Sequence, residues 1–267
     1  MAVSAHIRKN AELEREEMKL LGFPSYEGLY MHLDTTRAQT AEFDYVVTMS
    51  DFVKDSYVQN GFPAENICVA TPDIDTERFS PRIQSSDTDD TFRVLYVAHT
   101  QPLKGLHYLL QAWKDLELPD AKLVIAGGFT DMPEELRKRY LTEISDDSRI
   151  TWIQNAYRPE DLYRSASVLV FPTLTEGFGR VTLEAMACGI PVITTVNARG
   201  VVEEGKTGFV VPIRDANAIR EKLQYLYNNR EVVREMGYAA RNAVEQKRSF
   251  GETVYEICEN IVEKKHV

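Results

Sequence analysis

The sequence predicts an α/β protein built on a doubly wound parallel sheet, and two observations support this fold class. After residue 91, short and continuously apolar segments alternate with longer amphipathic segments. The short segments indicate strands that are buried on both faces, and the long ones indicate helices. Regular alternation with right-handed crossovers gives a Rossmann-like sheet that is covered by helices on both faces.

The order of the expected elements also predicts where a ligand would bind. Strands are expected at residues 93–97, 122–126, 150–153, 168–171, 191–195 and 208–212. Helices are expected at residues 105–116, 133–144, 159–166 and 181–188, and three more begin at Ala216, Glu231 and Phe250. Ligands of such sheets bind beyond the carboxyl ends of the strands. This rule selects the loops at residues 98–104, 127–131, 154–158, 172–180 and 196–200.

The first 81 residues are less regular than the rest of the chain. A Glu-rich helix is expected at residues 5–21, because Gly22 and Pro24 end it. The further elements expected are a helical stretch at 26–42, a strand at 45–49, a helix at 51–60 and a strand at 67–71. Residues 80–90 are polar, acidic and aperiodic, as is typical of an interdomain linker. We therefore expect two units, residues 1–81 and residues 82–267.

Composition excludes several classes of protein. The 267 residues carry a formal net charge of −10, which disfavours nucleic acid as a partner but leaves a local site for small anions possible. Cys68, Cys188 and Cys258 fit neither a disulfide framework nor a zinc pattern. No apolar run is long enough to cross a membrane, and residues 1–10 lack the apolar core of a signal peptide. We expect a cytoplasmic protein, with peripheral membrane contact left open.

The loop at residues 172–180 carries the most informative motif. Gly177 and Gly179 let the backbone approach a ligand closely, and the helix that follows directs free amide groups to the same place. This combination suits a diphosphate. Glu184, in that helix, would accept hydrogen bonds from a ribose diol. An isolated glutamate more often faces solvent, but the glycines and the strand-loop-helix context favour a ligand.

Lys104 lies on another loop at the same edge of the sheet. Taken alone, it is interpreted as a solvated surface lysine. Its position opposite the loop that carries Glu176 favours a second interpretation, in which its ammonium group balances the charge of a phosphate. The two loops together predict an anion site at the carboxyl edge of the sheet.

Residues 171–193, FPTLTEGFGRVTLEAMACGIPVI, resemble the signature segment of glycosyltransferase family 4. The segment contains that family's E-x7-E pair as Glu176 and Glu184. Other stretches that resemble the family are residues 44–81, 207–212 and 236–241. The resemblance extends over nearly the whole chain from about residue 40 onward.

The resemblance implies a GT-B fold with two facing Rossmann-like domains. It implies retaining transfer of a sugar from a nucleotide diphosphate, such as UDP or GDP, to a glycan, a lipid-linked acceptor or a small molecule. No cofactor and no obligatory metal are implied. Residues 1–81 would be a remnant of the acceptor domain, and residues 82–267 the nucleotide-sugar-binding domain. The last helix would cross back to the N-terminal part, and the inner face of the membrane is a further expected location.

The resemblance also assigns roles to individual residues. Glu176 would be catalytic and would favour positive charge at the anomeric carbon of the transferred sugar. Glu184 would hold the ribose. The other residues implied to bind the donor are His99, Lys104, Ala156, Tyr157, Gly177, Phe178, Gly179, Arg180, Val181 and Thr182. Among them, Ala156 and Tyr157 would contact the base, and Arg180, Val181 and Thr182 would line the diphosphate.

Two departures from the family pattern stand out. The family has a Gly and then an Arg a few residues before the equivalent of Lys104, whereas this chain has Ala98 and His99. A neutral His donates a single hydrogen bond, so phosphate anchoring would be weaker. In addition, about 80 residues precede the linker, too few for a whole acceptor domain.

The short N-terminal part keeps other functions open. A catalytically incomplete nucleotide-sugar-binding subunit that needs a partner is the main alternative to the transferase. A related epimerase or hydrolase is disfavoured by the E-G-F-G loop. Asp73 and Asp75 match a D-x-D metal motif, but they precede the linker rather than a nucleotide loop, and the histidines lack ligand spacing. We therefore expect no metal.

A final expectation concerns apolar stripes. The last helix, from Phe250, carries apolar residues three and four positions apart, and the helices within residues 5–42 would lack their own core strands. Uncovered stripes of this kind associate. We therefore expect a dimer, a partner subunit or a poorly soluble chain.

Overall fold

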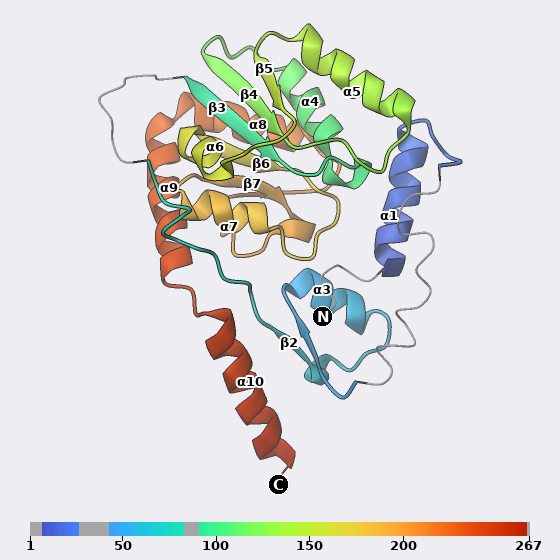
Figure 1. Cartoon of the computed structure of the whole chain (residues 1–267), viewed down its shortest axis with the longest axis vertical. Helices are drawn as coiled ribbons and strands as arrows, with labels where there is room; N and C mark the ends of the chain where they lie inside the picture. Colours follow the sequence, from blue (N-terminus) through green and yellow to red (C-terminus); the bar gives the residue numbers. More distant parts are fainter. Residues whose placement is uncertain (1–6, 27–42, 83–90, 266–267) are drawn as a thin grey trace.

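A six-stranded parallel sheet forms the centre of the described part of the chain, which in this computed structural model comprises residues 7–26, 43–82 and 91–265 (Figure 1). Its strands lie in the order β5-β4-β3-β6-β7-β8. Their bounds are β3 Phe92–Val97, β4 Ala121–Ala126, β5 Ile150–Ile153, β6 Val168–Phe171, β7 Val192–Thr195 and β8 Gly208–Val211. The order runs outward in both directions from β3 and β6, so the predicted doubly wound sheet is confirmed.

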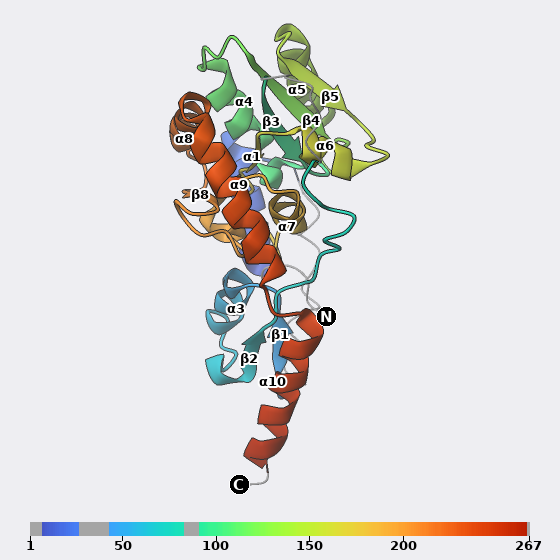
Figure 2. The ribbon, with the colours of Figure 1, turned by 90° about the vertical axis from the view of Figure 1, so that its left-hand side faces the viewer.

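Helices cover both faces of this sheet, as Figures 1 and 2 show. Their bounds are α4 Leu106–Lys114, α5 Glu134–Asp146, α6 Pro159–Ser165, α7 Arg180–Ala187, α8 Ala216–Asn228, α9 Arg230–Glu245 and α10 Phe250–Lys265. Helices α4, α5 and α8 pack on one face, and α6 and α7 pack on the other with α9 against α7. Among the described residues, the periodicity did not predict the 3-10 turns η2 Ala64–Asn66, η3 Pro102–Lys104 and η4 Val196–Ala198.

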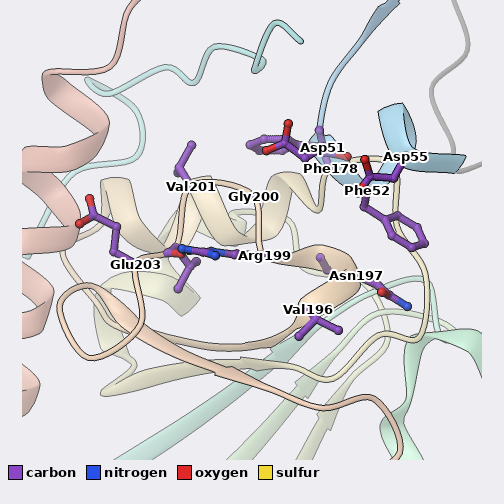
Figure 3. A pocket seen from close by; sticks show the side chains of 13 residues that line it. Asp51, Phe52, Asp55, Phe178, Val196, Asn197, Arg199, Gly200, Val201 and Glu203 are labelled. Atoms are coloured by element: carbon purple, nitrogen blue, oxygen red, sulfur yellow. Dashed lines mark hydrogen bonds between the residues drawn. The ribbon is translucent and has the colours of Figure 1, made fainter. Parts of the chain in front are cut away.

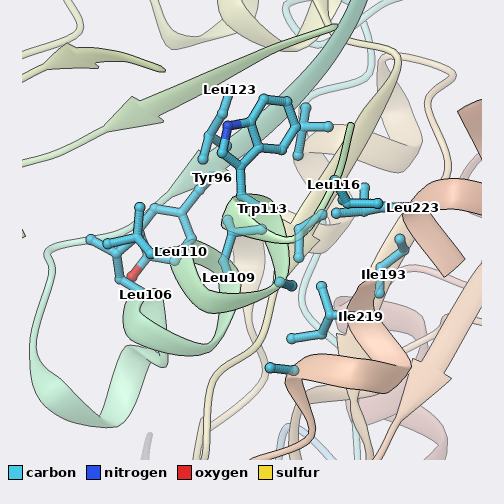
Figure 4. Packing of buried hydrophobic residues seen from close by; sticks show 14 of the residues in the cluster. Tyr96, Leu106, Leu109, Leu110, Trp113, Leu116, Leu123, Ile193, Ile219 and Leu223 are labelled. Carbon is cyan, nitrogen blue, oxygen red and sulfur yellow. The ribbon is translucent and has the colours of Figure 1, made fainter. Parts of the chain in front are cut away.

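Alternation of side chains along β3 explains why the middle of this strand is a continuous apolar run. Val94 and Tyr96 belong to the core beneath α4 and α8, whereas Leu95, between them, belongs to the core beneath α6 and α7. All three side chains are at most 1% exposed. Figure 4 shows the first of these cores, in which Trp113 of α4 is fully buried near Leu223 of α8. The middle of β3 is buried on both faces and is therefore apolar at consecutive positions, whereas Arg93, near its start, is only partly buried.

The N-terminal part contains a second, two-stranded parallel sheet. Strands β1 (Val46–Thr48) and β2 (Ile67–Val69) pair directly, and α3 (Asp51–Val58) packs on them through Val53 and Tyr57. These elements match the predicted strands and helix. The helical stretch expected at residues 26–42 lies, from residue 27 onward, outside the described residues, and so do residues 83–90 of the expected linker.

Helix α1 (Ile7–Leu20) packs on the larger sheet unit rather than exposing an apolar stripe. Leu13 is 3% exposed and contacts the cluster of Leu103 and Leu174, and Met18 is 1% exposed in the core beneath α4. The expectation of an uncovered stripe is therefore wrong for α1. The reason is that α4 and the loops after β3 and β6 bury the apolar face of this helix.

Helix α10 projects away from the body of the molecule in both views (Figures 1 and 2). The backbone N–H of Phe250 donates to the Asp73 carboxylate at 3.0 Å, and the Lys247 ammonium donates to the Thr71 carbonyl at 3.2 Å. These contacts attach the start of the helix to the N-terminal part. Farther along, Tyr255 and Val262 are 66% and 54% exposed, so much of its surface is open.

A close backbone approach in the sheet unit involves Gly105, which has a φ of +69° and follows η3. A Cβ atom at this position would lie 2.0 Å from the carbonyl oxygen of Pro172. We predict that Gly105→Ala lowers the free energy of unfolding by about 2 kcal/mol or more, measured by urea denaturation. Gly128→Ala is the matched control because its Cβ would meet nothing within 4 Å, and it should change stability by about 0.5 kcal/mol or less. Equal losses in both variants would contradict this account of the contact.

Candidate functional site

An ion pair between Lys104 and Glu176 lies where the two halves of the sheet diverge. Lys104 ends η3, which follows β3, and Glu176 lies in the loop that follows β6. Strands β3 and β6 are direct neighbours, but the chain leaves them toward opposite faces of the sheet. This topological switch point is where open α/β sheets bind their ligands. The structure thus brings together the two charged residues that the sequence singled out on separate loops.

Backbone contacts tie the two loops together beneath this ion pair. The N–H of Leu174 donates to the carbonyl of Leu103 at 2.8 Å, and the hydroxyl of Thr173 donates to the same carbonyl at 3.0 Å. The side chains of Lys104 and Glu176 are 22% and 23% exposed, so both remain accessible to a ligand. A charged ligand would meet a preformed, half-buried pair of opposite charges.

The glycine-rich turn lies between Glu176 and α7. One carboxylate oxygen of Glu176 accepts a hydrogen bond from the N–H of Gly177 at 3.2 Å. Gly179 adopts a left-handed conformation with φ of 80° and caps α7 without a side-chain hydrogen bond. The first amide groups of α7 therefore have no side-chain partner at the cap, and they lie at the carboxyl edge of the sheet. This is the arrangement that favours a bound anion.

Glu184 lies one turn into α7 and accepts a hydrogen bond from the hydroxyl of Tyr163 in α6 at 2.6 Å. Burial and the neighbouring Glu184 charge raise the pKa of Tyr163 well above its ordinary value, so its phenol stays protonated and donates. One carboxylate oxygen is thereby fixed and the half-buried carboxylate is held in place. Sequence analysis missed Tyr163, because no local pattern shows that α6 packs beside α7.

The other residues implied to bind the donor fall into two groups. His99, Tyr157 and Arg180 are exposed at the carboxyl edge of the sheet, with Tyr157 at 98%, and Ala156 and Val181 are partly buried there.

Phe178 and Thr182 differ from this group because their side chains are buried. The Phe178 ring packs in the core beneath α7, and the Thr182 hydroxyl donates to the Gly179 carbonyl at 2.8 Å. Both side chains therefore pack inside the protein, and the Thr182 N–H also donates to the Gly179 carbonyl at 2.8 Å.

A polar cavity of about 550 Å³ adjoins the glycine-rich turn on the side of α3 (Figure 3). Asp51 and Asp55, one helical turn apart on α3, line one wall. The loop that follows β7 supplies another wall, including Arg199, and Phe178 of the glycine-rich turn also lines the cavity. The cavity therefore joins the N-terminal part of the chain to the loop that carries Glu176.

A buried carboxylate, Glu17, connects α1 to the sheet unit. Its side chain is fully buried and accepts hydrogen bonds from His107 at 2.6 Å, from the Tyr108 hydroxyl at 2.8 Å and from Arg214 at 2.9 Å. Because the carboxylate only accepts, His107 donates to it from Nε2, and its Nδ1 is hydrogen-bonded to the Tyr140 hydroxyl at 2.9 Å. The network fixes α1 beside η3 and the glycine-rich turn.

The aspartates of the D-x-D sequence have structural roles. Asp75 accepts hydrogen bonds from the backbone N–H groups of Glu77 and Arg78 at 3.0 and 2.9 Å, and Asp73 binds the start of α10. Within residues 7–26, 43–82 and 91–265, no group of three His, Cys, Asp or Glu side chains is arranged to hold a metal ion. In the same residues, no helix combines the length and apolarity that a membrane span requires.

The α/β sheet, its switch point and the glycine-rich turn before α7 are features of a GT-B-like α/β fold. The family model for glycosyl transferases group 1 matches residues 77–243. The chain belongs to this family.

Two curated relatives show where the similarity lies. The capsular polysaccharide biosynthesis glycosyltransferase CapM of Staphylococcus aureus is 34% identical over 164 residues, which are 60% of this chain and 43% of that protein. The D-inositol 3-phosphate glycosyltransferase of Corynebacterium urealyticum is 32% identical over 211 residues, 70% of this chain and 49% of that protein. The chain thus spans about half the length of the curated relatives it matches.

A solved structure supports the same fold. The structure of Anabaena Alr3699/HepE in complex with UDP and glucose superposes with a TM-score of 0.74 at 19% identity, covering 87% of this chain and 68% of that chain. At this level of identity the likeness shows the fold. It confirms the predicted GT-B-like arrangement of the sheet and helices.

The Glu17 network predicts a pH dependence of stability. Burial alone would raise the pKa of Glu17, but the hydrogen bond and charge of His107, with the hydrogen bonds of Arg214 and Tyr108, lower it below its ordinary value of 4.5. A lowered folded-state pKa stabilises the fold above pH 4.5, and this stability is lost as the pH falls through the folded-state pKa.

We predict that Glu17→Gln costs about 2 kcal/mol of unfolding free energy at pH 7, and less as the pH falls below 4.5. Glu16→Gln is the control, since Glu16 also contacts Arg214 at 3.1 Å but its side chain is 61% exposed. That variant should change stability by about 0.5 kcal/mol or less. Urea denaturation at several pH values measures both, and a Glu17→Gln cost that stays constant from pH 7 to pH 3 would refute the proposed charge contribution.

Proposed function

We propose that this chain is the donor-binding part of a retaining glycosyltransferase of family 4, which transfers a sugar from a nucleotide diphosphate such as UDP or GDP. The observation that carries the proposal is the Lys104–Glu176 ion pair at the switch point, next to the glycine-capped start of α7. Support for the nucleotide comes from the similar fold of Alr3699/HepE, whose structure holds UDP and glucose.

In the proposed complex, the diphosphate lies at the start of α7. Amide groups of the turn from Gly177 to Gly179 and the first residues of α7 would donate to the sugar hydroxyls and phosphate oxygens. The Lys104 ammonium, which is paired with Glu176 in this structure, would neutralise the phosphate charge. The exposed Arg180 and His99 would add donors at the rim, and neutral His99 would add a single one.

Glu184 and the loop after β5 would hold the nucleoside. The Tyr163 hydroxyl fixes one oxygen of the Glu184 carboxylate, and the other would accept from the ribose hydroxyls. Ala156 and the exposed ring of Tyr157 would contact the base. No cofactor and no metal take part in this proposal, because the Lys104 ammonium and backbone amides supply the positive charge.

The proposed reaction breaks the bond between the anomeric carbon and the diphosphate oxygen and forms a bond to an acceptor hydroxyl on the same face. The acceptor proton passes to the departing phosphate oxygen, so atoms and charge balance. Positive charge develops at the anomeric carbon, where the Glu176 carboxylate would stabilise it. Negative charge develops on the diphosphate, where Lys104 and the amides of α7 would stabilise it.

The acceptor is proposed to be a glycan, a lipid-linked sugar or a small molecule. In a complete enzyme, a separate acceptor domain would bind this molecule. The alternative is a nucleotide-sugar-binding subunit that acts with a partner. Nucleotide binding without turnover would identify that alternative.

Donor binding is the first test of the proposal. Isothermal titration with UDP, GDP and ADP, without added metal, should show binding of at least one nucleotide to the folded chain. The expected reason is that the turn, the start of α7 and Lys104 converge on one diphosphate. If a folded sample bound none of the three, the proposed donor site would be wrong.

The two glutamates are expected to respond differently to substitution. Glu184→Ala should weaken nucleotide binding by about 1.5–3 kcal/mol, because a charged acceptor of ribose hydrogen bonds is lost. Glu176→Ala should leave the affinity for the bare nucleotide nearly unchanged and lower the turnover of the complete enzyme. Calorimetry with the preferred nucleotide separates the two roles, and loss of nucleotide binding in Glu176→Ala would show that they are misassigned.

A further inference from the structure

Both chain neighbours of Glu176 are hydrogen-bonded to residues from the N-terminal part of the chain. The Thr175 hydroxyl donates to the side-chain oxygen of Asn10 in α1 at 2.6 Å. The Ser50 hydroxyl, just before α3, donates to the Gly177 carbonyl at 2.7 Å. These partners are separated by 165 and 127 positions in the sequence, so the two bonds join distant segments on either side of one residue.

We propose that Asn10 and Ser50 are positioning residues that hold the Glu176 loop in its working conformation. The inference rests on the role proposed above for Glu176 as the residue next to the reacting carbon. Neither residue needs to touch the substrate, because each acts through the backbone or side chain of a loop residue. Residues 1–81 would thereby contribute to donor chemistry as well as to the proposed acceptor side.

The Ser50 bond controls the orientation of a peptide plane. The carbonyl of Gly177 and the N–H of Phe178 belong to the same planar trans peptide and point in opposite directions. When Ser50 holds that carbonyl, it also directs the Phe178 amide away from α3. A glycine at 177 has few conformational restraints of its own, so an external hydrogen bond has a large influence on this plane.

Capping of α3 does not account for this geometry by itself. Ser50 is also the N-cap of α3, but the hydrogen bond that it accepts from the Val53 N–H is 3.4 Å long. The bond that it donates to Gly177 is 2.7 Å, which is the usual length for strong O–H···O contacts. The shorter bond connects Ser50 to the site loop rather than to its own helix.

The Asn10 bond is buried on both sides. Asn10 is 1% exposed and Thr175 is 4% exposed, so loss of this partner would leave the Thr175 hydroxyl without water to replace it. One turn along α1, Leu13 packs against Leu103 and Leu174, the residues that precede Lys104 and Thr175. Helix α1 therefore contacts both loops that supply the Lys104–Glu176 pair.

The test compares Ser50→Ala with Ser56→Ala and with Ser50→Thr in the full chain. Ser56 is the matched control because its hydroxyl donates to the Val53 carbonyl within α3 at 2.6 Å, away from the glycine-rich turn. Each variant is assayed for hydrolysis of UDP-glucose, for UDP affinity and for melting temperature. A positioning role predicts about a tenfold lower kcat for Ser50→Ala, with KM and UDP affinity within about twofold of the parent chain.

Ser50→Thr keeps a hydroxyl and should restore kcat to within about twofold, whereas Ser56→Ala should leave kcat unchanged. An unchanged kcat in Ser50→Ala would overturn the proposal for Ser50. The proposal for Ser50 would also be overturned if the loss of kcat followed a loss of melting temperature, or if Ser50→Thr failed to restore kcat.

The Asn10 bond is tested with Asn10→Ala and Thr175→Val, each of which should lower kcat. The double variant should lose no more kcat than either single variant, since both substitutions remove the same hydrogen bond.

Hydrogen exchange of the turn at residues 176–179 provides a readout that is independent of turnover. Faster exchange there in Ser50→Ala, but not in Ser56→Ala, is expected, and equal exchange in the two variants would overturn the proposal. A parent chain that binds none of UDP, GDP and ADP would count against the proposed function alone, and the exchange comparison would still decide the positioning role. Failure of the proposed function and failure of the positioning role are therefore distinguishable.

Discussion

The close contact between the loops after β3 and β6 is the constraint on which the rest of the site depends. Neighbouring parallel strands bring these loops to one edge of the sheet, and the approach of Gly105 to the Pro172 carbonyl brings η3 onto the other loop. Lys104 and Glu176 can form their ion pair only because both backbones run this close together. The chain leaves β3 and β6 toward opposite faces of the sheet, and this divergence opens the crevice that a nucleotide would enter.

A second layer of contacts supports this arrangement from the N-terminal part. Helix α1 lies on the two loops through Leu13 and is fixed by the buried carboxylate of Glu17, and Ser50 reaches the turn beyond Glu176. The sheet unit positions the charged groups, and the segments before it restrict the loop that carries them. The loop that carries Glu176 and the N-terminal part are therefore connected through hydrogen bonds.

Local patterns predicted the sheet and the glycine-rich turn but not the long-range contacts. Strand β3 was predictable because burial on both faces of its middle favours consecutive apolar residues, here Val94, Leu95 and Tyr96. Gly177 and Gly179 could be identified from the sequence because glycines between a strand and a helix let the backbone approach a ligand closely. The Tyr163–Glu184 bond and the docking of α1 were not predictable, since each depends on which elements become neighbours in space. Residues 27–42 and 83–90 lie outside the described residues.

The most direct test of the central claim is a crystal structure of the chain with UDP. The account predicts the diphosphate at the start of α7 beside Lys104, with the ribose on the free oxygen of Glu184 and the Tyr163 hydroxyl still bound to the other. It also predicts that the turn from Glu176 to Gly179 keeps its position in the complex. A nucleotide bound elsewhere, for example in the cavity beside Asp51 and Asp55, would contradict the account.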